Sequence, residues 1–99
     1  MIRHVVTWKL SATDEATRTA DAAAIVAVLA ALPPLVPSIR ALTVGQNMLN
    51  PGTNWDVTLV ADFDDVEGLV AYQVHPDHVA VASTIGPRVS QKVTADIEI

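Results

Sequence analysis

The segment Trp55-Asp-Val-Thr-Leu-Val-Ala-Asp-Phe63 alternates between two kinds of side chain. Every odd position is apolar, and the even positions are mostly polar. Because successive side chains of a strand point to opposite faces, this alternation predicts a β-strand with one buried face over residues 55–63. The predicted buried set is Trp55, Val57, Leu59, Ala61 and Phe63.

A helix is predicted directly after this strand. The spacing Asp64-x-x-Glu67 has the form of a capping box, with Asp64 as the N-cap. The helix is expected to end near Val74, because the residue before a proline avoids helical angles and Pro76 follows closely. Pro76 in turn suits the first turn of a second, shorter helix over about residues 77–84.

The N-terminal half shows the same succession of patterns. An alternating strand is followed by apolar residues at helical spacing, for which Ser11 and Thr13 are the N-cap candidates. Three prolines end that helix. The remaining predicted elements are a strand over residues 2–9, a helix over 13–32, a strand over 39–47 and a last strand over 93–99.

The predicted order is β-α-β-β-α-β within a single domain, residues 1–99. With right-handed crossovers this order gives the ferredoxin-like α+β fold, a four-stranded antiparallel sheet with its helices on one face. The other face is left open. It would carry Val5, Thr7, Thr58 and Val60. A half-apolar open face is a candidate interface, for which a two-fold homodimer is the commonest closure. The alternative is that its Thr and Asp side chains simply face water.

Composition excludes several classes of protein. The chain has 99 residues, of which 51% are hydrophobic and 17% charged, a composition that argues against intrinsic disorder. A net charge of −5 argues against nucleic acid or an anionic membrane as partner. There is no cysteine, and the longest apolar run, residues 22–32, is too short to cross a bilayer. The N-terminus lacks the pattern of a signal peptide, so a cytoplasmic protein is expected.

Three histidines are the main candidates for chemistry. His4 falls on the buried face of the first strand, where an imidazole needs a hydrogen-bond partner or a cavity. A core histidine satisfied by one protein group is the alternative reading. His75 precedes Pro76 and can cap the short helix. Capping does not explain His78.

Aromatic side chains complete the candidate site. Tyr72 follows Leu69 by three residues, so it lies beside it on the helix and can pack or direct its hydroxyl into a pocket. Trp8 and Trp55 are predicted on inner strand faces, as core residues or as cavity walls. With no nucleophile motif or phosphate-binding loop, the remaining chemistry is His/Tyr acid–base work on a small, largely apolar molecule.

A metal site is the other chemistry that the histidines could supply. His75-x-x-His78 with His4 or Asp77 has the ligand types of a zinc or iron site. Pro76 directs the two neighbouring histidines apart, so neither a metal nor any other cofactor is expected.

Three segments together resemble the stress-responsive A/B barrel (Dabb) family, and the likeness covers essentially the whole chain. They are Ile2-Arg-His-Val-Val-Thr-Trp-Lys9, Leu32-Pro-Pro-Leu-Val-Pro-Ser-Ile39 and Tyr72-Gln-Val-His-Pro-Asp-His-Val79. The Tyr-x-x-His-Pro-x-His block and the N-terminal histidine are the specific part. The family implies a ferredoxin-like protomer that pairs through its open sheet into a dimeric α/β barrel.

The resemblance also implies roles for individual residues. Cyclases of this family use the histidine that matches His78 as a base, the tyrosine that matches Tyr72 as its assistant, and the histidine that matches His4 to position the substrate. Trp8, Trp55 and His75 are expected to contact the ligand. Such cyclases also carry a tyrosine on the first helix, where this chain has only Ala and Val, in Ile25-Val26-Ala27.

Three functions are compatible with this reading. The first is a dimeric protein that binds a small molecule without catalysis. The second is a cofactor-independent cyclase or lyase acting on a polyketide-like or other carbonyl substrate. The third is a cofactor-free oxygenase of the dimeric barrel type, which follows from analogy of fold alone.

Overall fold

The structure is a computed structural model that describes residues 1–99. Seven helices and strands and one 3-10 turn follow each other along the chain. They are β1 (Ile2–Leu10), α1 (Glu15–Ala30), β2 (Ala41–Gln46), β3 (Val57–Phe63), α2 (Val66–Val74), α3 (Pro76–Ile85), η1 (Gly86–Arg88) and β4 (Val89–Glu98).

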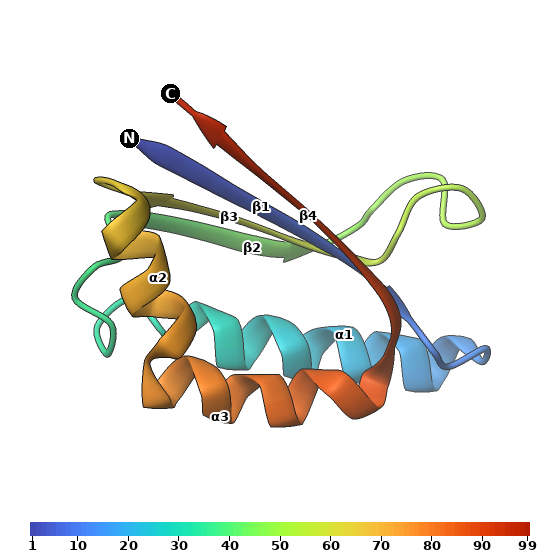
Figure 1. Cartoon of the computed structure of the whole chain (residues 1–99). Helices are drawn as coiled ribbons and strands as arrows, with labels where there is room; N and C mark the ends of the chain where they lie inside the picture. Colours follow the sequence, from blue (N-terminus) through green and yellow to red (C-terminus); the bar gives the residue numbers. More distant parts are fainter.

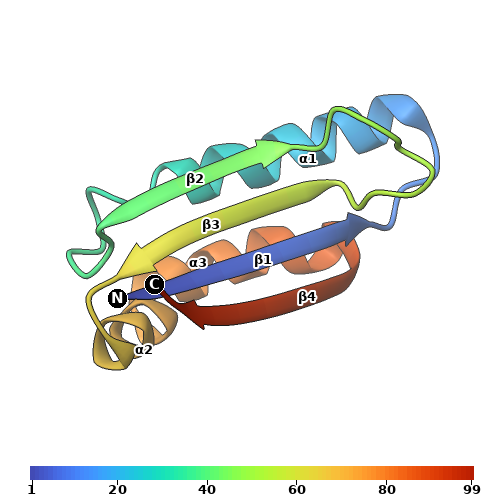
Figure 2. The same ribbon diagram turned by 90° about the horizontal axis from the view of Figure 1, so that it is seen from above.

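The four strands form one antiparallel sheet in the order β2-β3-β1-β4. All three helices lie on the same side of the sheet (Figure 1). Seen from the other side, the strands lie side by side with no helix over them (Figure 2). This is the ferredoxin-like arrangement, so the predicted fold is confirmed.

The N-cap of α1 differs from the prediction. Asp14 is the cap, and its carboxylate accepts a hydrogen bond of 2.9 Å from the backbone N–H of Thr17. Ser11 and Thr13 were therefore the wrong candidates, because only Asp14 sits three residues before the first free N–H groups that need an acceptor. The helix ends at Ala30, slightly earlier than the apolar pattern predicts.

The N-cap of α2 is shifted by one residue. Asp65 accepts a 2.8 Å hydrogen bond from the backbone N–H of Gly68. Asp64, the predicted cap, instead accepts a 2.7 Å hydrogen bond from the guanidinium of Arg40. With two adjacent aspartates, the sequence pattern could not tell which carboxylate faces the helix.

Strand β3 begins at Val57, so the prediction that it starts at Trp55 is wrong. Asp56 explains the difference. Its carboxylate accepts a 2.8 Å hydrogen bond from the backbone N–H of Leu10 and pairs with Arg18, and these contacts hold the residue outside the regular strand. Trp55 consequently lies in the loop that joins β2 to β3.

The core fills the space between the helices and the sheet. Every odd residue of β3 is buried, as the alternation predicts. Strand β4 is different, since no helix packs extensively against it and its residues after Val89 are exposed. The core side chains are Val6, Trp8, Leu10, Ala22, Ile25, Leu29, Leu32, Val36, Ile39, Val57, Leu59, Ala61, Phe63, Leu69, Tyr72, Val81 and Ile85.

The open face of the sheet carries a continuous apolar strip. Val5 lies between Val60 on β3 and Ala95 on β4 in the strand register. The apolar side chains that β4 adds to this face are half exposed, Val93 at 54% and Ile97 at 50%. An uncovered apolar sheet face of this kind marks an interaction surface. None of the helices combines the length and apolar character needed to cross a membrane.

Candidate functional site

Three rings from three different elements meet under the sheet. Tyr72, on α2, lies between His4 on β1 and His78 on α3. The Tyr72 and His78 ring centroids are 4.3 Å apart, and those of Tyr72 and His4 are 6.1 Å apart in an edge-on arrangement. The helix break at Pro76 makes this possible, because it redirects the chain so that both Tyr72 and His78 face β1.

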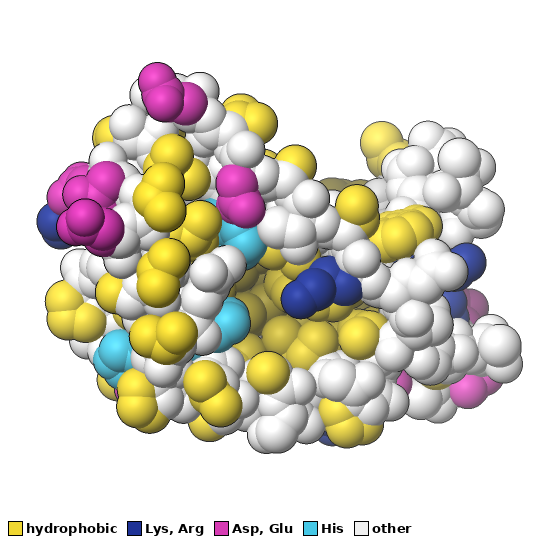
Figure 3. Space-filling model, in the orientation of Figure 1, with side chains coloured by type: hydrophobic (Ala, Val, Ile, Leu, Met, Phe, Trp, Pro, Cys, Tyr) yellow, Lys and Arg dark blue, Asp and Glu magenta, His cyan; other side chains and the backbone are white.

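These rings line a cavity of about 110 Å³. It adjoins a second cavity of about 260 Å³ that is lined mainly by apolar residues of α3 and β4. Trp8, His78 and Lys92 line both, so the two cavities share walls. Figure 3 shows this region as a hollow with a hydrophobic floor and histidine on one side. The combined lining is His4, Val6, Trp8, Tyr72, Gln73, His78, Val81, Ala82, Ile85, Gly86, Val89, Lys92 and Thr94.

His4 is fixed by an aspartate that the sequence analysis missed. Its ring is 6% exposed, and its Nδ1 lies 2.6 Å from Oδ1 of Asp96 on β4. The register pairs His4 directly with Asp96. The alternation of residues 93–99 placed Asp96 on one strand face, but only the pairing of β4 with β1 assigns it to His4. The contact orients the ring, because it holds Nδ1 against the carboxylate.

His78 is held in one tautomer by the backbone. Its Nδ1 donates to the carbonyl oxygen of Gln73 at 3.1 Å, which leaves the lone pair on Nε2. Burial lowers the pKa of His78 below its ordinary value of 6.5, the hydrogen bond to Gln73 opposes this shift, and the neighbouring His4 and Lys92 add to it. The ring is therefore neutral at pH 7 and can accept a proton.

Tyr72 presents a neutral hydroxyl to the cavity. The side chain is 2% exposed and packs against Phe63, with ring centroids 5.1 Å apart. Burial raises the pKa of Tyr72 to about 12. The buried side-chain atoms without a hydrogen-bond partner are Ser38 Oγ and Arg88 Nε, and the Tyr72 hydroxyl is not among them. This hydroxyl has no partner in the protein, so it remains accessible from the cavity. It is free to donate a hydrogen bond to a ligand.

Of the three residues expected to contact a ligand, only Trp8 lines the cavities. His75 is the N-cap of α3, where its Nδ1 accepts a 3.1 Å hydrogen bond from the backbone N–H of Asp77. This confirms the capping prediction and leaves His75 outside both cavities. No group of three or more His, Cys, Asp or Glu side chains is arranged to hold a metal ion.

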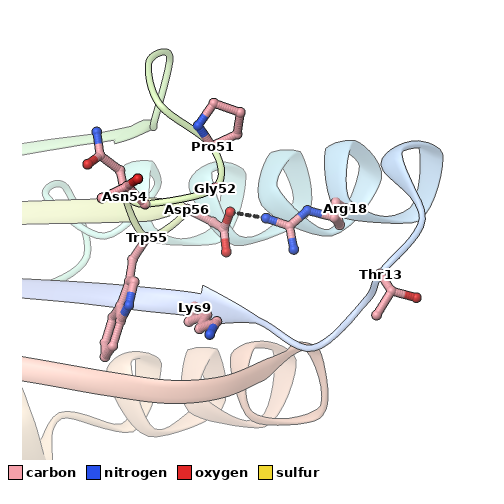
Figure 4. A pocket seen from close by; sticks show the side chains of 9 residues that line it. Lys9, Thr13, Arg18, Pro51, Gly52, Asn54, Trp55 and Asp56 are labelled. Carbon is pink, nitrogen blue, oxygen red and sulfur yellow. Dashed lines mark hydrogen bonds and ion pairs between the residues drawn. The ribbon is translucent and has the colours of Figure 1, made fainter.

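Trp55 lies in a different depression, shown in Figure 4. This depression has a volume of about 360 Å³ and is formed largely by the β2–β3 loop. Its lining is mostly polar, and its Arg18 and Asp56 are already paired with each other. A small apolar ligand would bury little apolar surface there. Ligand pockets are usually lined predominantly by apolar groups with a few convergent polar ones. The two adjoining cavities at Tyr72 and α3 together meet that description better, because one supplies the apolar lining and the other the polar groups.

Several solved structures resemble the chain, although no curated protein matches its sequence closely. A dimeric protein of unknown function with a ferredoxin-like fold from Bacteroides fragilis has a TM-score of 0.90 and 28% identity, covering 99% of this chain and 95% of its own. A dimeric ferredoxin-like protein of unknown function from Thermobifida fusca has a TM-score of 0.83 and 28% identity, covering 99% and 90%.

A third similar structure has a named activity. The hydroxynitrile lyase from Passiflora edulis has a TM-score of 0.76 over 99% of this chain and 92% of its own, with 17% identity, a level that shows a common fold. The family match is decisive, because it spans residues 2–99 and so includes every element of the sheet and every ring of the cavity. The chain therefore belongs to the family of the stress-responsive A/B barrel domain.

Proposed function

We propose that this protein binds a small, largely apolar molecule in the cavity at Tyr72 and acts as a homodimer. The Tyr72 hydroxyl carries the proposal, because it has no hydrogen-bond partner in the protein and is accessible from the cavity, so a bound ligand can accept from it. The apolar cavity beside it gives such a ligand a place for its body. The dimeric relatives from Bacteroides fragilis and Thermobifida fusca support the assembly.

Binding is tested with phenylacetone, a small apolar ketone. Titration into ¹⁵N-labelled protein is expected to shift the backbone amides of Gln73 and His78 and to leave those of the β2–β3 loop unchanged. Tyr72→Phe removes only the donor and is expected to weaken binding by about fivefold, the typical contribution of one neutral hydrogen bond. Shifts confined to residues 47–56, or no shifts at all, would refute the proposed site.

Proton transfer is a second candidate function, favoured by the tautomer of His78. With Nε2 unprotonated and Tyr72 adjacent, His78 can take the α-proton of a bound ketone while the Tyr72 hydroxyl donates to the enolate oxygen. Returning the proton to the same carbon completes an exchange. In D₂O this replaces the α-hydrogen by deuterium without any cofactor.

The exchange is measured by the loss of the methylene signal of phenylacetone in ¹H NMR. His78→Ala is expected to reduce the rate to that of buffer, whereas Val79→Ala, an exposed neighbour on α3, is expected to leave it unchanged. A rate equal to buffer in the wild type, together with normal binding, would leave binding alone as the function. Oxygen uptake with a phenolic probe would instead favour the oxygenase.

A further inference from the structure

The two lysines differ from the other basic residues in having no acidic partner. All four arginines form an ion pair with an aspartate. Lys9 and Lys92 form none. Lys92 is paired with Trp8 in the β1–β4 register and lines both cavities.

No acidic side chain lines either cavity. The nearest carboxylate on the same face of β4 is Asp96, four residues along, which corresponds to roughly 13 Å of strand. Asp96 is engaged with His4. The other titratable groups in the walls are His4, whose partner is this aspartate, and Tyr72 and His78, which are both uncharged at pH 7. Lys92 is therefore the one uncompensated charge in the lining.

We infer that the cavity takes its ligand as an organic monocarboxylate, with the carboxylate at the Lys92 ammonium and an apolar body against Val81 and Ile85. This inference rests on the proposed function, since it specifies the ligand class of that same site. The carboxylate end lies where the two cavities share walls, at Trp8 and His78. The rest of the ligand then extends along the apolar side of α3.

The electrostatic effect of Lys92 is local. A protein of net charge −5 repels anions at long range, but at physiological ionic strength charges beyond about 8 Å are largely screened. A cation within contact distance then dominates the choice between a charged and a neutral ligand. One ammonium matches a single negative charge, whereas phosphate groups are typically held by arginine clusters or by rows of backbone N–H groups.

Octanoate and octanamide provide the test, because they share an alkyl chain and differ in charge. The protein is used with Trp55→Phe, so that Trp8 is the only tryptophan and its fluorescence reports the cavity. Octanoate is expected to bind about fivefold more tightly than octanamide, the upper end for a solvent-exposed ion pair. Lys92→Met is expected to remove that difference, and Lys9→Met, which changes the other unpaired lysine, is expected to retain it.

The outcomes separate the two proposals. Equal affinity for both compounds, or a preference for octanoate that survives Lys92→Met, would overturn the monocarboxylate inference and leave the cavity as a binding site. Failure of both compounds to quench Trp8 would count against the cavity itself. Loss of the preference in Lys92→Met together with unchanged octanamide binding would support the inference, since misfolding would weaken both compounds.

Discussion

His4 and Asp96 are 92 residues apart in the chain, yet His4 Nδ1 and Asp96 Oδ1 lie 2.6 Å apart across the β1–β4 ladder. The imidazole is buried, while the carboxylate side chain is 42% exposed. The partly exposed carboxylate of Asp96 is therefore the hydrogen-bond partner of the buried His4 ring. The same contact fixes the His4 ring where it lines the cavity beside Tyr72.

Replacing Asp96 by Ala is expected to lower the free energy of unfolding by about 1–3 kcal/mol, the cost of leaving a buried polar group unpaired. Urea denaturation measures this. Glu98→Ala is the matched control, since Glu98 lies on the same face of β4, is exposed and makes no side-chain hydrogen bond. Equal stability of the two variants would mean that His4 does not depend on Asp96.

The His78 imidazole is expected to titrate with a midpoint below 6.5, because burial lowers its pKa. The unfolded chain then takes up this proton at a higher pH than the folded protein. Between the two pKa values the unfolded state binds more protons, so this group makes the free energy of unfolding fall as the pH is lowered from about 6.5. The Hε1 resonance of His78 reports the titration. Lys92→Met should raise the midpoint, and a wild-type midpoint at or above 6.5 would contradict the prediction.

His75 is expected to contribute to stability through its cap on α3. His75→Ala removes the acceptor for the backbone N–H of Asp77 and is expected to cost about 0.5–2 kcal/mol in the free energy of unfolding. His75→Asn retains an acceptor and should cost much less. Thermal or urea denaturation of the pair distinguishes capping from a ligand-binding role. Weaker binding of phenylacetone with unchanged stability would assign His75 to the site.

The open sheet face is expected to hold the homodimer together. Val93→Asp places a charge in the apolar strip, where burial of an unpaired carboxylate is costly, and is expected to give a monomer by light scattering. Val79→Asp changes an equally exposed valine on the helical side and should remain dimeric. A dimer that persists in Val93→Asp would place the interface elsewhere.

Much of this architecture could be predicted from local patterns. Alternation in residues 2–9 and 57–63 assigned the buried faces of β1 and β3, and so placed His4 toward the helices. The proline after His75 predicted the break between α2 and α3. These features depend on residues within a few positions of each other. Over such short segments the strand period of two residues and the helix period of 3.6 residues can be told apart from the sequence.

The partners of the site residues depended on the tertiary structure. Asp96 and Lys92 belong to the site only because β4 pairs with β1 in one register, and a shift of one residue would turn both to the open face. Trp55 continued the alternation but lies outside β3, because the Asp56 side chain bonds across to β1. Local periodicity specifies which way a side chain points within its own element, whereas contacts between distant elements are set by packing and strand register, which no short segment contains.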